Sequence, residues 1–280
     1  MLHLRDLSTL DHFRAVERLE GEIWGGIDLV PVPILAVTVQ RGAVLIGAWD
    51  GDRLAGFVYS FPSLRPTAGP PWVAHWSHML GVDPDYRGRG LARDLKLAQR
   101  DRVLGLGLDL VEWTFDPLQA LNAHLNFVKL GVVVCEYEPN VYGESPSPLH
   151  GGLPTDRFVC QWWIRRPHVE RRVHPIGLPL VAQEVAGAPI VTDTRVADGW
   201  LECMAHETER RDARLAVEIP SDYTAMLAGA PALARRWRFQ AREIFTAYLA
   251  AGYRVVDFTL DRKHGRGRYL LSSIPAPEDR

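Results

Sequence analysis

The sequence has almost no lysine, few cysteines and no long apolar run. Only three of its 32 basic residues are lysine, and the formal charge of −2 indicates no general attraction to nucleic acid or to an anionic membrane. Cys135, Cys160 and Cys203 form no CxxC pair, so neither a zinc site nor a disulfide framework is expected. The most apolar run, Leu29–Val39, is broken by two prolines and is too short to cross a bilayer. The N-terminus is charged where a signal peptide would be apolar, so we expect a cytoplasmic protein. From the cysteines, the short apolar run and the net charge, we expect neither a metal nor a membrane or nucleic-acid partner.

The order of hydrophobic periods predicts an α/β (α+β) fold with a mixed sheet. The chain of 280 residues, 47% apolar, suffices for one large or two modest domains. Thr9 is placed to cap a helix that reaches Trp24, and Asp50-Gly51-Asp52 lies between two apolar runs as a hairpin turn would. The other expected elements of the first half are a strand at 2–7, a weaker helix after 33, strands at 43–49, 54–61 and 75–82, a helix ending near 104, a strand at 109–115 and a helix within 116–132.

A glycine-rich turn between a strand and a helix is the clearest chemical signal. In Asp83–Ala92 (DPDYRGRGLA), Gly88 and Gly90 remove Cβ atoms, so that backbone N–H groups at the helix start can approach an anion. Arg87 and Arg89 add positive charge. No Gly-Lys-Ser/Thr follows, so the turn is not a Walker A loop, and a plain tight turn remains the alternative interpretation of the glycine pair by itself.

This segment resembles motif A of the GCN5-related N-acetyltransferase (GNAT) superfamily. The family's Gln/Arg-x-x-Gly-x-Gly/Ala signature is met by Arg87, Gly90 and Ala92, and the predicted element order fits the GNAT fold over residues 1–166. The resemblance implies that the turn holds the coenzyme A pyrophosphate, that the strand before it pairs with pantetheine, and that an asparagine of the following helix faces the same arm. The implied coenzyme-binding residues are Leu80, Gly81, Val82, Arg87, Gly88, Arg89, Gly90, Leu91, Ala92, Asn122 and Asn126.

One position departs from the family pattern. Many members carry a tyrosine four residues before the glycine of a Leu-Gly-Phe motif, where it protonates the departing thiolate; here that glycine is Gly131 and the earlier residue is Phe127. A coenzyme thiol with a pKa near that of free cysteine (~8.5) is a tolerable leaving group without an acid. Tyr137 and Tyr142 lie downstream, and Tyr142 is our candidate for a relocated acid, with a packed aromatic as the alternative.

Two residues are candidates for accepting the proton of an ammonium substrate. His78 lies in the strand before the turn, and Glu112 lies in the next strand. Neither is preferred over the other, and His78 is equally well explained as a core histidine. Arg65 could clamp a substrate carboxylate bidentately.

The second half of the chain contains an echo of the first. Residues 167–180 are rich in proline and charge and are predicted to link a domain at 1–166 to one at 181–280. GYRVVDFTLD at 252–261 matches GLDLVEWTFD at 107–116 at four positions, which suggests a partial, degenerate GNAT-like repeat; an unrelated α+β cap is the alternative. The helix before 252 is amphipathic, and its arginines, Arg238 among them, are expected on the solvated face.

Together these features predict an acyltransferase of the GNAT type. The leading hypothesis is transfer of an acetyl or succinyl group from its coenzyme A thioester to a small-molecule amine. The layout also looks like bacterial GNAT proteins of this size, several of them encoded beside N-acylamino-acid racemases, and by that analogy the amine is an amino acid. A non-catalytic acyl-CoA sensor and a protein N-acetyltransferase are the alternatives. An open sheet edge in a partial repeat could also support a homodimer.

Overall fold

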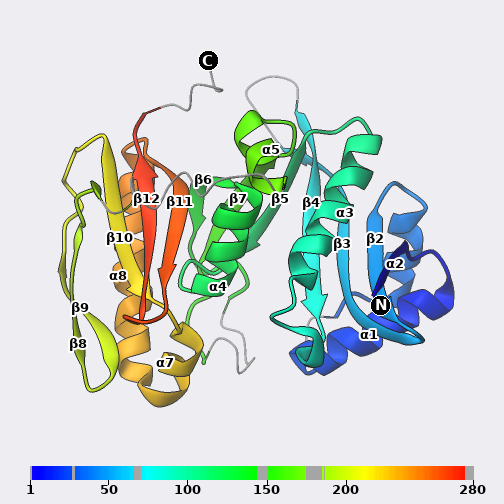
Figure 1. Ribbon diagram of the computed structural model, residues 1–280, viewed down its shortest axis with the longest axis horizontal. Coiled ribbons are helices and arrows are strands. Elements are labelled where there is room, and N and C mark those ends of the chain that lie inside the picture. Colours follow the sequence, from blue (N-terminus) through cyan, green and yellow to red (C-terminus); the bar gives the residue numbers. More distant parts are fainter. Residues whose placement is uncertain are drawn as a thin grey trace. The chain divides into compact units, whose positions relative to one another are not determined.

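The computed structural model describes residues 2–26, 29–65, 71–143, 151–174, 185 and 187–274. The chain forms two compact units (Figure 1). Unit 1 comprises Met1–Trp113 with Trp163–Arg165, and unit 2 comprises Thr114–Trp162 with Arg166–Arg280. The division therefore falls earlier than the domain boundary predicted near residue 166, because residues 114–162 pack with the C-terminal part of the chain.

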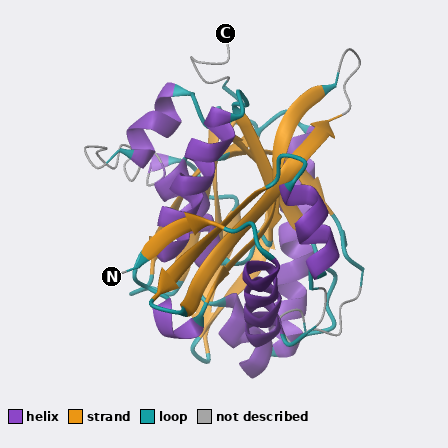
Figure 2. Ribbon diagram, turned by 90° about the vertical axis from the view of Figure 1, so that its right-hand side faces the viewer, coloured by secondary structure: helices purple, strands orange, loops and turns teal. Residues whose placement is uncertain are grey.

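Unit 1 is a five-stranded sheet with helices on both faces. Figure 2 shows helices on either side of these strands. The strands are ordered β1-β2-β3-β4-β5; the first four run antiparallel, and β4 and β5 are parallel. The elements are β1 (His3–Asp6), α1 (Leu10–Trp24), α2 (Val32–Val39), β2 (Val44–Asp50), β3 (Arg53–Arg65), β4 (Trp72–Val82), a 3₁₀ turn (Pro84–Tyr86), α3 (Leu91–Gly105) and β5 (Leu110–Phe115), whose last two residues belong to unit 2. This order confirms the elements predicted for this part of the sequence.

Local signals set the limits of α1. The Thr9 side chain accepts a hydrogen bond from the His12 N–H at the start, and Gly25 ends the helix at φ +80°. The buried residues of α1, including Phe13, Val16 and Leu19, pack on strands β2 and β3.

Two strand glycines show which helix covers which face. A Cβ at Gly56 of β3 would meet Leu91 and Leu95 of α3 at 3.3 Å. A Cβ at Gly81 of β4 would lie 2.9 Å from Ile23 of α1, with Trp24 also in contact. Helix α3 therefore covers one face of the sheet and α1 covers the other. Gly81 is required by this close packing.

Unit 2 is built on a second set of strands, ordered β7-β6-β11-β12-β10. The elements are α4 (Ala120–Ala123), a π-helical segment (His124–Leu130), β6 (Val133–Glu138), β7 (Arg157–Trp163), α5 (Pro167–Val173), β8 (Thr192–Ala197), β9 (Trp200–His206), β10 (Arg214–Pro220), α7 (Tyr223–Gly229), α8 (Pro231–Ala250), β11 (Arg254–Asp261) and β12 (Arg266–Ser272). Strands β8 and β9 form a separate hairpin. The core holds interlocked aromatic rings, among them Phe158, Phe245 and Tyr269.

The predicted linker at 167–180 is wrong over its first part. Pro167–Val173 is helix α5, with Val169 and Val173 buried one turn apart. Proline at the first helical position leaves no hydrogen bond unmade, so it starts this helix instead of excluding one. Arg172 then ties α5 to the π-helical segment by donating to the Phe127 carbonyl at 3.0 Å. Residues 175–180 lie outside the described residues.

The predicted solvated position of Arg238 is also wrong. Its side chain is 3% exposed, and it donates two hydrogen bonds to Asp116, at 2.9 and 2.6 Å. Asp116 is itself buried, and Arg238 supplies the charge that offsets its burial. An amphipathic pattern placed this arginine outside because the pattern does not identify a distant carboxylate.

The suggested repeat is not confirmed. Gly107 and Gly252 both follow a helix at positive φ and precede a strand, as the aligned sequences suggested. In unit 1, however, the parallel strands β4 and β5 are direct neighbours, whereas in unit 2 β12 lies between the parallel strands β10 and β11. The two halves thus differ in the order of their strands. Among the described residues, no helix has the length and apolar character needed to cross a membrane.

Candidate active site

The turn between β4 and α3 has the geometry of an anion cradle. Gly88 and Gly90 have φ values of +75° and +86°, in the left-handed region that favours glycine. Gly90 is the N-cap of α3 and contributes no side-chain cap; its carbonyl accepts from the N–H groups of Arg93 and Asp94. The amides of Leu91 and Ala92 precede these first helical hydrogen bonds, at the positive end of the helix dipole.

A network of charged side chains holds this turn on the β2–β3 hairpin. Arg53 Nη2 donates to Asp83 at 2.6 Å and to Asp85 at 2.7 Å. The Tyr86 hydroxyl donates to Asp50 at 3.0 Å, and its ring stacks against the guanidinium of Arg53 at 5.3 Å. The turn is therefore held by contacts on its inner side.

The outer side of the turn fits a phosphate group. A Cβ added at Gly88 or Gly90 would meet no protein atom within 4 Å, so the space in front of both glycines is open. Arg89 lies over the Tyr86 ring at 5.4 Å, and Arg87 Nε donates to the Val82 carbonyl at 3.1 Å. Open backbone, helix-start amides and two arginines are the chemistry that a pyrophosphate needs. The residues predicted from 87 to 92 are thus brought together.

The strand before the turn diverges from its neighbour. Leu80, Gly81 and Val82 pair with β3, opposite Val58, Phe57 and Gly56. On the other side, the pairings of the described residues join β4 to β5 only at His75↔Val111 and Trp76↔Glu112. Residues 80–82 therefore have no described pairing with β5, and the pairing of this edge with a pantetheine arm stays a prediction.

His78 occupies a β-bulge at this point of divergence. Tyr59 pairs with Met79 and Ser60 with Ser77, so His78 is an extra residue on β4. Its ring is open to solvent on one side and packs against Tyr59 and Phe61, with ring centroids 6.0 and 5.7 Å away. This partial burial lowers the pKa of His78, which favours the neutral imidazole at pH 7.

Glu112 lies on the same face of the sheet as His78, the face opposite α3. Its neighbour Trp113 points the other way, under the Lys96 ammonium at 3.6 Å from the ring centroid, so strand alternation places Glu112 away from α3. The side chain of Glu112 is 5% exposed and forms an ion pair with Arg65. The two predicted proton acceptors therefore share one face, and Arg65 joins them there.

Sequence reasoning missed a buried lysine on the α3 face. Lys96 is 2% exposed and donates to Ser77 Oγ at 2.8 Å and to Gln99 Oε1 at 3.2 Å. Gln99 also donates to Ser77 at 3.1 Å. The available signal was that one of only three lysines in the chain lies among the apolar positions of this helix. This network fixes β4 just before the bulge.

The remaining predicted residues belong to unit 2. Asn122 is exposed and Asn126 is buried, one turn apart on α4 and the π-helical segment. The Tyr142 hydroxyl hydrogen-bonds with Thr114 Oγ1 at 3.0 Å, and its ring is exposed. Their roles toward a coenzyme stay predictions.

Phe127 is fully buried, with its ring against Phe115 and Tyr269 at centroid distances of 6.3 and 5.7 Å. The position that carries the usual acid is therefore part of the core of unit 2. Among the residues that the structure describes, no cluster of His, Cys, Asp or Glu could hold a metal ion.

Residues 12–131 match the family model described as the acetyltransferase (GNAT) family. None of the curated proteins matches the chain. Among solved structures, a putative acetyltransferase (yncA) from Salmonella typhimurium with its cofactor acetyl-CoA is 17% identical, with a TM-score of 0.46 over 59% of this chain and 95% of that one. The ribosomal-protein-S18-alanine N-acetyltransferase of Escherichia coli is 16% identical, with a TM-score of 0.45 over 57% and 92% of the two chains.

Proposed function

We propose that the protein transfers an acetyl group from acetyl-CoA to the amine of a small zwitterion, an amino acid, and the premise is the match of residues 12–131 to the GNAT acetyltransferase family. The observation that carries the proposal is the Arg65–Glu112 ion pair on the face of the sheet that also bears His78. An adjacent guanidinium and carboxylate are complementary to the carboxylate and ammonium of an α-amino acid.

Each part of the site has one task in this proposal. The coenzyme supplies the acyl group as an activated thioester. The 87–92 turn would bind its diphosphate, and the β4 edge at 80–82 would align its extended arm. Arg65 would orient the acceptor carboxylate, leaving the ammonium beside Glu112 and His78.

The acceptor ammonium must lose one proton before its nitrogen can form the new C–N bond. The C–S bond then breaks, the coenzyme leaves as the thiolate, and the second proton released by the nitrogen converts the thiolate to the thiol. Neutral His78 can accept that proton directly, or Glu112 can accept it. Histidine with a lowered pKa remains unprotonated at pH 7, so it is available as a base without a further shift. A pH profile separates the two candidates: a base at His78 predicts that kcat/KM falls as pH drops through the lowered pKa of this histidine, and that this fall disappears in His78→Gln.

The test is a thiol-release assay with acetyl-CoA or succinyl-CoA as donor and three classes of amine as acceptor. These are free amino acids, the corresponding amino-acid amides, and peptides. We expect acetyl-CoA to support turnover of amino acids, with a KM at least ~10-fold higher for the amides, which lack the carboxylate that Arg65 would bind.

Arg65→Gln should raise the KM for the amino acid and leave that for the amide nearly unchanged. Turnover of peptides in preference to amino acids would overturn the proposal in favour of a protein acetyltransferase. Acetyl-CoA binding without turnover of any amine would instead identify an acyl-CoA sensor.

A further inference from the structure

Unit 2 contains a pocket of about 660 Å³ that the proposed acyl transfer does not use. It is formed by three segments: the end of the β8–β9 hairpin (196–201), the connection from β10 into α7 (220–226) and the β11–β12 turn (261–266). This volume lies within the range of ~300–1,000 Å³ typical of small-molecule sites. All of the lining residues are described residues of unit 2.

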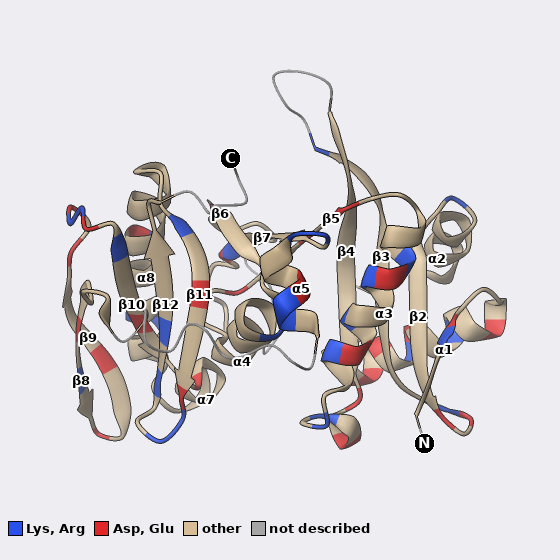
Figure 3. Ribbon diagram, turned by 45° about the horizontal axis from the view of Figure 1, so that its top comes forward, with Lys and Arg blue, Asp and Glu red and all other residues tan. Residues whose placement is uncertain are grey.

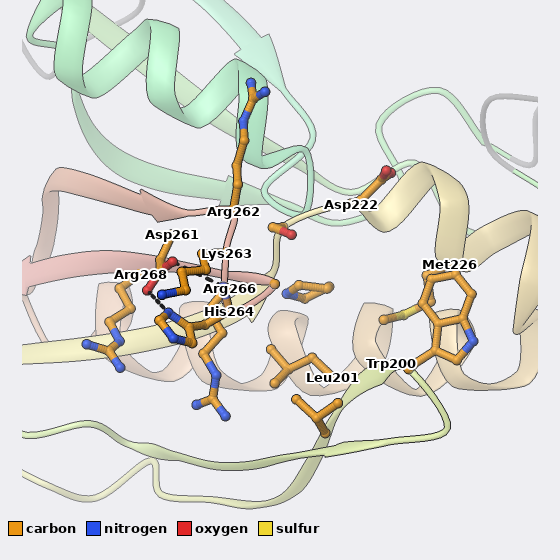
Figure 4. Close-up of a pocket in the computed structure, with 15 residues that line it drawn as sticks. Trp200, Leu201, Asp222, Met226, Asp261, Arg262, Lys263, His264, Arg266 and Arg268 are labelled. Atoms are coloured by element: carbon orange, nitrogen blue, oxygen red, sulfur yellow. Dashed lines mark hydrogen bonds and ion pairs between the residues drawn. The ribbon is translucent and has the colours of Figure 1, made fainter.

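The two ends of the pocket differ in chemistry (Figure 4). Trp200 and Met226 lie together at one end, with Leu201 between them and the centre. The β11–β12 turn supplies the other end with positive charge and is a basic segment in Figure 3. Lys263 is exposed on this turn, and Arg266 and Arg268 follow on β12.

The two arginines are held in place by one buried carboxylate. Glu218 of β10, 2% exposed, accepts from Arg266 Nη1 at 2.8 Å and from Arg268 Nε at 2.7 Å. Burial raises the pKa of Glu218, but hydrogen bonds from Thr194 and both arginines outweigh it and hold that pKa below its usual value. Each guanidinium has five N–H donors, so both keep donors for a ligand.

The acidic groups of the lining are engaged within their own segments. Asp222 accepts from the Ala225 N–H at 2.9 Å as the cap of α7. Asp261 accepts from His264 Nδ1 at 2.6 Å and from the His264 N–H at 3.1 Å. Arg262 points away from the pocket in Figure 4. Three cations, Lys263, Arg266 and Arg268, face two carboxylates, Glu218 and Asp261, at this end, which leaves a surplus of one positive charge.

We infer that this pocket binds a phosphate monoester that carries a flat apolar group, with the phosphate at Lys263, Arg266 and Arg268 and the apolar group against Trp200 and Met226. A phosphate monoester carries about −1.5 to −2 at pH 7 on three acceptor oxygens, so it can accept hydrogen bonds from the three cations at once, which the two oxygens of a carboxylate do less completely. Arginine and lysine together suit phosphate recognition, since the guanidinium forks orient the oxygens and the ammonium adds a mobile charge. The inference does not depend on the acyl-transfer proposal.

The test is calorimetric titration of the full chain with phenyl phosphate, with benzoate and with inorganic phosphate. We expect phenyl phosphate to bind more tightly than either other probe, because only it satisfies both ends of the pocket. Lys263→Glu should weaken this binding at least ~10-fold, since it replaces an attraction by a repulsion. Lys263→Arg should keep it. Lys263 is chosen because it is exposed and supports no buried group, so its variants are expected to fold.

Two matched variants locate the binding. Lys129→Glu makes the same charge change on an exposed lysine of unit 2 that does not line the pocket, and it should leave the affinity unchanged. Gly90→Glu, which alters the turn of unit 1, should also leave it unchanged. No binding of phenyl phosphate, equal binding in Lys263→Glu, loss of binding in Gly90→Glu, or tighter binding of benzoate would each overturn the inference.

Discussion

Replacing Gly90 with alanine or glutamate, and comparing each change with the same change at Gly107, isolates the function of the 87–92 turn. Gly90 and Gly107 lie at opposite ends of α3. Their φ values, +86° and +78°, are nearly equal, and a Cβ at either position would meet no atom within 4 Å. Any L-residue is therefore strained at both, by roughly 1 kcal/mol, which lowers the melting temperature by a few degrees.

Only the Gly90 substitutions should weaken acetyl-CoA binding. A Cβ at Gly90 enters the open space in front of the helix-start amides and should displace one charge-assisted hydrogen bond, worth ~1.5–3 kcal/mol, or at least about tenfold in Kd. A carboxylate there adds repulsion of about 3 kcal/mol at ~5 Å from a phosphate charge, taking an effective dielectric of ~20. Gly90→Glu should therefore lose more than ~100-fold in affinity.

The assay is calorimetric titration with acetyl-CoA, combined with thermal unfolding of each variant. Gly107→Ala and Gly107→Glu serve as controls for strain and for charge, and both should bind acetyl-CoA like the parent. If Gly90→Glu binds within about threefold of the parent, the turn does not hold the pyrophosphate and the reasoning fails. If the Gly107 variants lose binding to the same extent, the effect is one of stability and not of contact.

Three further predictions concern buried groups. Burial raises the pKa of Glu20 to about 7, so the folded chain keeps a proton that the unfolded chain releases above pH 4.5. The free energy of unfolding of the parent should therefore fall between pH 4.5 and 7. Above pH 7, urea unfolding should show Glu20→Gln to be more stable than the parent by up to ~3 kcal/mol. Parallel stability curves would contradict this. Burial raises the pKa of Asp116, but the charge and hydrogen bonds of Arg238 outweigh it and hold this pKa below 3.8. The ionised carboxylate therefore stabilises the fold above about pH 4, and this stabilisation is lost as pH falls through the lowered pKa. Arg238→Met should lower the free energy of unfolding by about 3–5 kcal/mol at pH 7, and part of this loss should be recovered at lower pH, where the unpaired Asp116 carboxyl is protonated. A loss below ~1 kcal/mol at pH 7 would show that the ion pair is not needed. Phe127→Tyr should lose ~1–3 kcal/mol without any rise in kcat, because its hydroxyl would be buried beside Tyr269; an increased kcat would show that this position reaches the thiol.

Much of unit 1 could be predicted because its signals are local. Thr9 caps α1, Gly51 turns the β2–β3 hairpin at φ +58°, and Gly90 begins α3. Each of these depends on the conformational preference of one residue and its near neighbours, which the sequence shows directly. The candidate coenzyme turn belongs to this class, since its glycines and helix start are consecutive.

The errors arose where a partner is distant in the sequence. Helix α5 was mistaken for a linker because its two buried valines are recognisable only once the surface they pack on is known. Arg238 was placed in solvent because Asp116, 122 residues away, does not appear in the helical pattern. The repeat between 107–116 and 252–261 reproduced a helix end and a strand but not the order of strands around them.

The sequence by itself determined the α/β class, the element order of unit 1, the family resemblance and the glycine turn, because hydrophobic period, caps and positive-φ positions act over a few residues. Tertiary structure decided the rest. Strand register placed His78 in a bulge and Glu112 on the same face, and the end of β3 brought Arg65 to Glu112. The insertion of β12 between β10 and β11, and the pocket built from three separate segments of unit 2, likewise depend on pairings between residues far apart in the chain. Such pairings are selected by the free energy of the whole packed unit, which no local pattern encodes.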